Sequence, residues 1–369
     1  MQFTIHHGVL GLAFLMALVM GAVTGRTHFC TMGGVSDWLV MGSTERMRAW
    51  LLAAAVATLG VLGLEASGAI VLPLDSFPPY RTENFAWPRY VLGGLMFGAG
   101  MTLAGGCANR VLVRIGGGNL KSVVVVVVAG LAAYAMMWTD FFGLFFLSWI
   151  EPVSLHLARS GIPSQELGAL VSAGKGGAVA HYAIGAALSL GALGFALASP
   201  DFRRNRGLLA SGLVVGLAVM GGWWVTGGTL GKAWKEYADF ASTVPSRVAV
   251  QSFTFVSPLG DAARYLMSPG NLSLLNFGIL AMLGVMTGSF LQGLAGRSLR
   301  LEWFASWGDF GAHILGALLM GVGGVLSMGC TIGQAVTGVS TLALGSFLTF
   351  ASIVLGAAGA IQARMKLLD

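Results

Sequence analysis

Three cysteines are the side chains of this chain best suited to chemistry. Cys30 lies in GRTHFCTMGG, Cys107 ends LGGLMFGAGMTLAGGC, and Cys330 ends LGALLMGVGGVLSMGC. Each stands at or just beyond the end of a long apolar segment. A thiol is soft and nucleophilic, and a glycine beside it lets another backbone or a ligand approach closely. The candidate site therefore consists of these cysteines and the glycines of their turns, Gly105, Gly106 and Gly329.

Composition predicts the class of protein. The chain has 369 residues, of which 56% are hydrophobic and 10% are charged, whereas a soluble domain carries about 25% charged residues. We therefore expect an integral membrane protein in a lipid bilayer. The net charge of +6 does not indicate nucleic-acid binding, because many basic residues fall in loops beside apolar spans. Without a CxxC pair or a Cys/His cluster, the sequence supports no metal, iron–sulfur or haem cofactor.

Hydrophobic segments predict an all-α fold, since about 20 apolar residues cross a bilayer as a helix. The valine run at 123–128 is β-branched, but an open strand in lipid leaves its backbone unsatisfied, so a helix is expected there too. The fourth segment is long and would form either one tilted helix or a helix and a half. The nine expected spans are about 8–25, 49–72, 90–107, 118–149, 177–198, 207–226, 272–292, 311–329 and 340–363.

Nine spans place the two termini on opposite sides of the membrane. Basic residues are more numerous beside the odd-numbered span ends and the C-terminus than on the other side. Because positive charge in short loops stays in the cytoplasm, we expect the N-terminus outside and the C-terminus in the cytoplasm.

The chain also repeats itself. Residues 92–107 match 315–330, so that Cys107 and Cys330 occupy equivalent positions. A weaker match places 29–37 on 253–261. In that match Thr254 takes the position of Cys30, and Asp37 meets Asp261.

The repeats predict how the single membrane domain, residues 1–369, is organised. Four spans fall in about 8–150 and four in about 207–363, with one connecting span at 177–198. An odd offset reverses the direction of crossing, so we expect two inverted four-helix repeats. In such folds re-entrant or broken segments from both halves meet near the midplane, where the substrate binds.

Charge near the cysteines favours an anion. Arg110, Arg114 and Lys121 follow Cys107, and helix N-termini nearby would add positive potential. Topology alone would also explain Arg114 and Lys121, so Arg110 is the better candidate. The motif around Cys330 carries no charge but bears the hydroxyl of Thr331. We therefore expect a path that is cationic at the Cys107 end and neutral at the Cys330 end.

Other polar residues have plainer interpretations. Asp37 and Asp261 would cap helices that begin just after them, with proton coupling as the alternative. His28 and Cys30 are two positions apart and do not face each other on a helix, which argues against a catalytic pair. His181 and the remaining histidines are scattered and are interpreted as packing or interfacial residues, and Arg26 marks the end of the first span.

The motifs GRTHFCTMGGVSDWL, LAGGCANRVLVRIGGGNLKS and SMGCTIGQAV resemble those of the YeeE/YedE family of bacterial inner-membrane sulfur transporters. The resemblance covers about residues 8–130 and 250–362. It implies a multi-pass protein of the inner membrane, with inverted repeats pinched at the middle, that takes up thiosulfate without acting as an enzyme. It also implies a small cytoplasmic sulfur-carrier protein as partner. The thiols that hand the anion inward would be Cys30, Cys107 and Cys330.

The chemistry of these residues is consistent with thiosulfate as a substrate. Cations can hold its sulfonate end, and thiols can donate weakly to its soft terminal sulfur. Three alternatives remain open. The chain could transport another sulfur or selenium species. It could be a membrane thiol redox or sulfur-transfer protein, although no base or resolving partner is evident. It could also be a channel in which the cysteines merely pack as small buried residues.

Overall fold

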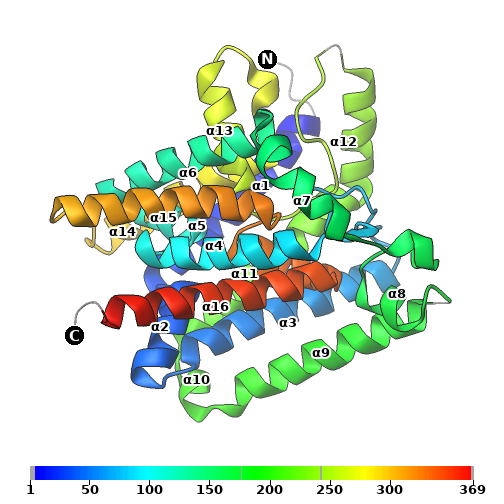
Figure 1. Ribbon diagram of the computed structural model, residues 1–369, viewed down its shortest axis with the longest axis horizontal. Helices are drawn as coiled ribbons and strands as arrows, with labels where there is room; N and C mark the ends of the chain where they lie inside the picture. Colours follow the sequence, from blue (N-terminus) through cyan, green and yellow to red (C-terminus); the bar gives the residue numbers. More distant parts are fainter. Residues whose placement is uncertain (1–4, 176, 242, 367–369) are drawn as a thin grey trace.

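The computed structural model describes residues 5–175, 177–241 and 243–366 (Figure 1). Within these ranges nine helical segments are long and apolar enough to cross a membrane, as the sequence predicts. Two of these segments are interrupted at a cysteine turn, so that a long helix is followed by a short one. The nine long helices are α1 (Ile5–Thr27), α3 (Glu45–Ala66), α4 (Trp87–Leu103), α6 (Leu120–Trp138), α9 (Ala178–Ala198), α11 (Arg206–Gly227), α14 (Phe277–Ala295), α15 (Trp307–Leu326) and α16 (Leu344–Lys366).

Short elements lie between the long helices. A two-stranded antiparallel sheet joins β1 (Asn84–Phe85) to β2 (Leu155–His156). The short helices are α2 (Thr31–Met41), α5 (Ala108–Gly116), α7 (Ser148–Ile150), α8 (Leu167–Val171), α10 (Pro200–Arg204), α12 (Thr229–Phe240) and α13 (Ser257–Met267). The π and 3-10 turns are η1 (Gly143–Leu147), η2 (Glu151–Val153), η3 (Leu157–Ser160), η4 (Leu272–Leu274), η5 (Ile332–Gly338) and η6 (Val339–Thr341).

The valine-rich segment is a helix, as expected, because a helix pairs its own backbone groups in lipid. Its start is fixed by Asn119, whose side chain accepts a hydrogen bond of 2.9 Å from the amide of Ser122. The helix ends at Trp138, and a short apolar helix follows at Gly143–Val153. The predicted span 118–149 is therefore a helix and a half rather than one tilted helix. The predicted span 49–72 was also too long, since α3 ends at Ala66.

Corresponding helices of the two halves pack in corresponding ways. Helix α4 packs against α16 and α6 packs against α15, while α1 packs against α14 and α3 against α11. Exchanging α4 with α15, α6 with α16, α1 with α11 and α3 with α14 turns each of these contacts into another one of the set. In Figure 1, α15, α4 and α16 run side by side along the longest axis of the molecule.

Helices α4 and α15, which contain the matching sequences, cross each other at glycines. A Cβ atom on Gly93 would lie 2.8 Å from the carbonyl oxygen of Gly323, and one on Gly100 would lie 2.7 Å from that of Gly316. The early glycine of each helix thus meets the late glycine of the other, so the two helices run antiparallel. Only glycine permits so close a backbone approach.

Candidate functional site

The three cysteines occupy the same local position in the fold. Each is the residue before a short helix: α2 begins after Cys30, α5 begins after Cys107, and the η5–η6 segment follows Cys330. Each cysteine carbonyl accepts the first helical hydrogen bond from the amide four residues on, at 3.0, 2.9 and 2.8 Å respectively. Because the first amides of a helix have no partner within it, each side chain lies beside N–H groups that the helix itself leaves available.

The cysteine side chains form a buried column. The thiols of Cys30 and Cys107 face each other. On its other side Cys107 faces the side chain of Thr331, the residue after Cys330. The sulfur of Cys330 accepts a hydrogen bond of 3.4 Å from the amide of Gly333. All three cysteines are buried, so this column is closed to solvent.

Thr254 lies beside Cys330, where the repeat places it. Its side chain faces the Cys330 sulfur, just as Cys30 faces Cys107. The sequence match put Thr254 at the position equivalent to Cys30, and the two contacts are equivalent as well. The fold thus contains a thiol–thiol pair and a hydroxyl–thiol pair in corresponding places.

Buried polar atoms without a good hydrogen-bond partner gather around this column. The Thr254 and Thr331 hydroxyls face sulfur atoms, but neither makes a well-formed hydrogen bond. The buried polar atoms of folded proteins are nearly all paired, so this concentration marks a place where a polar ligand would complete the bonding. The others among the described residues at this column are Thr31 Oγ1, Asn109 Oδ1 and Nδ2, Gln334 Oε1 and Tyr80 OH.

Tyr80 contributes a hydroxyl from outside the long helices. Its OH would lie 3.4 Å from a Cβ atom built on Gly333, close to the Thr254 hydroxyl. Burial, together with the nearby Cys330, raises the pKa of the phenol well above its usual value. Tyr80 therefore remains a neutral hydrogen-bond donor at the Cys330 end of the column.

Arg110 is the predicted cation that lies at the cysteines. Its charge interacts with both Cys30 and Cys107. Its Nη2 lies 3.0 Å from Nδ1 of His28, so His28 pairs with this arginine rather than with a thiol. Gly106, the residue before Cys107, leaves room for the Arg110 side chain, since a Cβ there would lie 2.8 Å from its Cγ.

The two other basic residues after Cys107 are paired with carboxylates. Arg114 donates to the carbonyl of Gly105 at 3.1 Å and lies 3.5 Å from Glu302. Lys121 forms an ion pair of 2.8 Å with Asp309. These contacts fix the loop after α5, so the structural interpretation fits Arg114 and Lys121 better than a direct role at the thiols.

The prediction that Asp37 and Asp261 cap helices is wrong. Asp37 lies inside α2 and Asp261 inside α13, and both form ion pairs instead. Asp37 lies 3.2 Å from Arg46, and Asp261 lies 3.1 Å from Arg247. Matching positions of the two repeats therefore carry matching carboxylate–arginine pairs, which the sequence did not reveal because the arginines lie at unrelated spacings.

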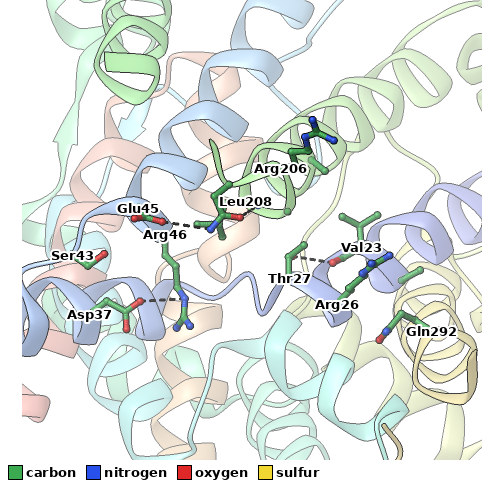
Figure 2. Close-up of a pocket in the computed structure, with 14 residues that line it drawn as sticks. Val23, Arg26, Thr27, Asp37, Ser43, Glu45, Arg46, Arg206, Leu208 and Gln292 are labelled. Atoms are coloured by element: carbon green, nitrogen blue, oxygen red, sulfur yellow. Dashed lines mark hydrogen bonds and ion pairs between the residues drawn. The ribbon is translucent and has the colours of Figure 1, made fainter. Parts of the chain in front are cut away.

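A cavity of about 860 Å³ opens beyond Cys30. Figure 2 shows Asp37 and Arg46 pointing toward each other on one side of it, with Arg26 and Arg206 on the other. The predicted supporting residue Arg26 thus lines this cavity at the end of α1. The guanidinium of Arg46 also reaches toward Gly33, three residues after Cys30, which places positive charge between the cavity and the column.

Two arginines lie near the turn before Cys330, although the motif itself carries no charge. A cavity of about 220 Å³ beside Met328 is lined by Arg89 and Arg247. Arg89 donates to the carbonyl of Leu326 at 2.8 Å. Arg89 lies at the start of α4, far from Cys330 in sequence. The uncharged motif around Cys330 therefore did not predict this nearby positive charge.

The turns before Cys107 and Cys330 have the same backbone. The amides of Gly106 and Gly329 each donate a 2.8 Å hydrogen bond to the carbonyl five residues earlier. The residue before each is left-handed, with φ of +74° at Gly105 and +61° at Met328. Met328 therefore adopts a conformation that favours glycine, which shows that the turn is required by the fold.

His181 is the clearest residue that the sequence analysis misjudged. It lies between the carboxylates of Glu65 and Glu166, with Arg81 on the far side of Glu65. It is therefore part of a buried ion cluster rather than a packing residue. Glu65 and Arg81 lie about a hundred residues before Glu166 and His181, and only the folded structure brings the two pairs together.

Long apolar helices around a buried column of polar groups define a multi-pass membrane protein. The sequence profile of the sulphur transport family matches residues 26–359. The chain belongs to this family.

Two curated relatives align with nearly the whole chain, and a third aligns with part of it. The thiosulfate transporter TsuA of Spirochaeta thermophila is 27% identical over 93% of this chain and 95% of its own length. The thiosulfate transporter TsuA of Escherichia coli is 22% identical over 93% and 92%. The probable transporter YedE of Salmonella typhimurium is 30% identical over 39% of this chain and 34% of its own length.

Proposed function

We propose that this protein takes up thiosulfate, or a closely related sulfur-containing anion, across the bacterial inner membrane. The observation that carries the proposal is the set of unpaired buried hydroxyl and amide groups around three thiols. Two relatives that align over nearly the full length are named thiosulfate transporters. The N-terminus would lie outside and the C-terminus in the cytoplasm.

The chemistry of the column suits such an anion. Thiosulfate has a charged sulfonate end and a soft terminal sulfur. Amides at the starts of α2 and α5, with Arg110, would bind the oxygens, while the thiols would donate weakly to the sulfur. Sulfate lacks the soft end, so thiols give a reason for selectivity. Movement of the short helices would open the column on each side in turn.

The path would cross the meeting point of two inverted repeats, about 8–150 and 207–363, joined by the helix at 177–198. The antiparallel crossing of α4 and α15 supports this organisation, because a two-fold axis between equivalent antiparallel helices inverts one half relative to the other. The reciprocal glycine contacts at that crossing have the same symmetry.

Passage without covalent sulfur chemistry is supported by the surroundings of the thiols. A nucleophilic thiol needs a base within hydrogen-bond reach, and His28 is bonded to Arg110 instead. On the cytoplasmic side, the cavity lined by Arg26, Arg46 and Arg206 would release the anion toward a small sulfur-carrier protein.

The test is uptake of radiolabelled thiosulfate into proteoliposomes by the wild type and by the Cys30→Ala, Cys107→Ala and Cys330→Ala variants. We expect each variant to lose uptake, with Cys107→Ala the most severe because its thiol contacts both neighbours. Wild-type rates in all three variants would reject the cysteine path. Absence of uptake by the wild type, with another sulfur or selenium anion taken up instead, would reject the substrate. A persulfide trapped on Cys107 during turnover would favour a sulfur-transfer protein.

A further inference from the structure

The imidazole of His181, in the first turn of α9, contacts a carboxylate at each of its nitrogens. Nε2 lies 3.1 Å from Oε2 of Glu65, at the end of α3, and Nδ1 lies 2.9 Å from Oε1 of Glu166, the residue before α8. Arg81 forms a 2.8 Å ion pair with the other oxygen of Glu65. The side chains of these residues are only 10–13% exposed, so the cluster is largely shielded from water.

This geometry requires a proton in addition to that of a neutral ring. A neutral imidazole has one N–H and one acceptor nitrogen, so it would present a lone pair to one of the two carboxylates. With the extra proton on the ring, or on either carboxyl group, both short contacts become hydrogen bonds. The protonated cluster has two positive and two negative groups and is neutral, whereas loss of the proton would leave one uncompensated buried negative charge.

We propose that Glu65, Glu166 and His181 form a proton-binding site whose occupancy holds the segment after Cys330 in place and thereby controls uptake. The second part rests on the proposed function, whereas proton binding does not. The other charged group that faces this site is Arg81, from the loop before β1. Tyr182 of α9 packs its ring 5.1 Å from the imidazole.

The cluster is connected to the Cys330 segment through the backbone. Arg81 Nε donates to the carbonyl of Thr341, the last residue of η6, at 3.0 Å. The amide of Leu167, next to Glu166, donates to the carbonyl of Leu342 at 3.0 Å. Leu342 has a φ of +57°, a conformation that costs a non-glycine residue energy and persists only when neighbours hold it. The residues of the proton site and their neighbour Leu167 thus hold Thr341 and Leu342, where η6 ends ahead of α16.

Protons have access to the site. A cavity of about 270 Å³ is lined by Glu65, Arg81, Glu166 and His181. It lies at the opposite end of α3 from the cavity of Figure 2, which Glu45 lines. Twenty residues of α3 separate Glu45 from Glu65, which is about 30 Å at 1.5 Å per residue. In the proposed topology the site therefore samples the outer pH.

Two measurements test the proposal. Nitrogen NMR of ring-labelled histidine in the wild type reads the protonation of His181 directly, with its signal identified by its loss in His181→Lys or His181→Gln. Thiosulfate uptake into proteoliposomes is then followed against outer pH at constant inner pH. We expect a shared, protonated ring at neutral pH and wild-type uptake that falls by up to about tenfold per pH unit once the site loses its proton. His181→Lys, which stays charged, should flatten this profile.

The matched control is His156→Gln, which changes a more exposed histidine whose Nε2 lies 3.6 Å from Glu151. It should keep the wild-type profile. A cluster without the additional proton at neutral pH would overturn proton binding. A profile unchanged in both His181→Lys and His181→Gln would overturn the control of uptake. If the wild type took up no thiosulfate at all, the proposed function would fail, while the NMR titration would still decide whether the site binds a proton.

Discussion

The thiol of Cys30 faces the thiol of Cys107, and the hydroxyl of Thr254 faces the thiol of Cys330 in the equivalent position of the second repeat. Half of the column therefore presents two soft donors, and the other half presents one soft and one hard donor. A ligand with a soft and a hard end can be oriented by such a difference. Cys30 is the residue that creates it.

Changing Cys30→Thr gives both halves the hydroxyl–thiol pair. We expect a folded protein, because Thr254 already fits the equivalent position, but slower uptake of thiosulfate. A loss of about 1.4 kcal/mol at the barrier reduces the rate about tenfold, and we expect at least this much. Initial uptake rates and thermal unfolding measure the two effects. Thr254→Cys should keep substantial uptake, and a wild-type rate in Cys30→Thr would contradict the importance of the thiol pair.

Arg110→Gln should weaken uptake at low substrate concentration, because Arg110 is the predicted cation that interacts with both Cys30 and Cys107. Hydrogen bonds to charged groups contribute about 1.5–3 kcal/mol, so the ratio of maximal rate to KM should fall about 10- to 100-fold. Arg114→Gln is the matched control, since Arg114 pairs with Glu302 rather than with a cysteine. Equal effects of the two substitutions would show that general positive charge, rather than Arg110 itself, matters.

Gly105 and Met328 should respond to substitution with opposite signs. Both are left-handed, and this conformation costs an L-residue roughly 1–2 kcal/mol. Gly105→Ala should lower stability by about this amount, and its Cβ would also meet the Arg114 guanidinium at 2.8 Å. Met328→Gly should raise the unfolding midpoint unless the lost methionine side chain contributes as much. Tryptophan fluorescence during thermal unfolding distinguishes these results, and stabilisation by Gly105→Ala would refute the argument.

The ion pairs at the matching positions should differ in strength. Asp261 accepts hydrogen bonds from Arg247, from Trp138 at 3.2 Å and from Asn276 at 3.0 Å, and its side chain is 5% exposed. Breaking a buried pair by removing one charge costs about 3–5 kcal/mol. Asp261→Asn should therefore destabilise the protein far more than Asp37→Asn, whose partner Arg46 is 35% exposed. Similar unfolding midpoints for the two variants would disprove this ranking.

Glu166 gives stability a dependence on acid pH. Burial by itself would raise its pKa, but hydrogen bonds from His181 and from the amides of Gly168 and Ala169 outweigh this and hold the pKa below 4.5. Its contribution is therefore complete above the unfolded value and is lost as the pH falls through the lower folded value. Glu166→Gln should be less stable than wild type at neutral pH by about 1–3 kcal/mol. This difference should shrink on acidification below 4.5, whereas a difference independent of pH would exclude the carboxylate as its cause.

The sequence predicted the features that depend on local composition. The nine spans follow from hydropathy, and the interrupted segments follow from glycine and cysteine at their ends. The alignment matched Cys30 with Thr254, and in the structure these two residues face Cys107 and Cys330 respectively. The long fourth span was harder, because the residues around Gly143 remain apolar although the helix has already ended at Trp138.

The features that depend on tertiary contacts were not predictable in this way. Arg89 and Arg247 reach the Cys330 end from different segments, and Arg46 pairs with Asp37 across a turn rather than along a helix. Without knowledge of the arginine partners, Asp37 and Asp261 were interpreted as helix caps. His181 appeared isolated in the sequence for the same reason. Its partner Glu65 lies more than a hundred residues earlier, and its partner Glu166 lies in a separate segment before α8.

Helix α9 packs mainly against α3 and α8, and its buried residues are only Gly185, Ser189 and Ala196. If a duplicated four-span unit arose by tandem fusion, one further crossing was needed to reverse the second copy, and α9 would be that crossing. Selection would then act mainly on the length and hydrophobicity of α9. The sequence of its outward face should vary freely between species. His181 would be the exception, because through it a connecting helix became part of a proton-binding site.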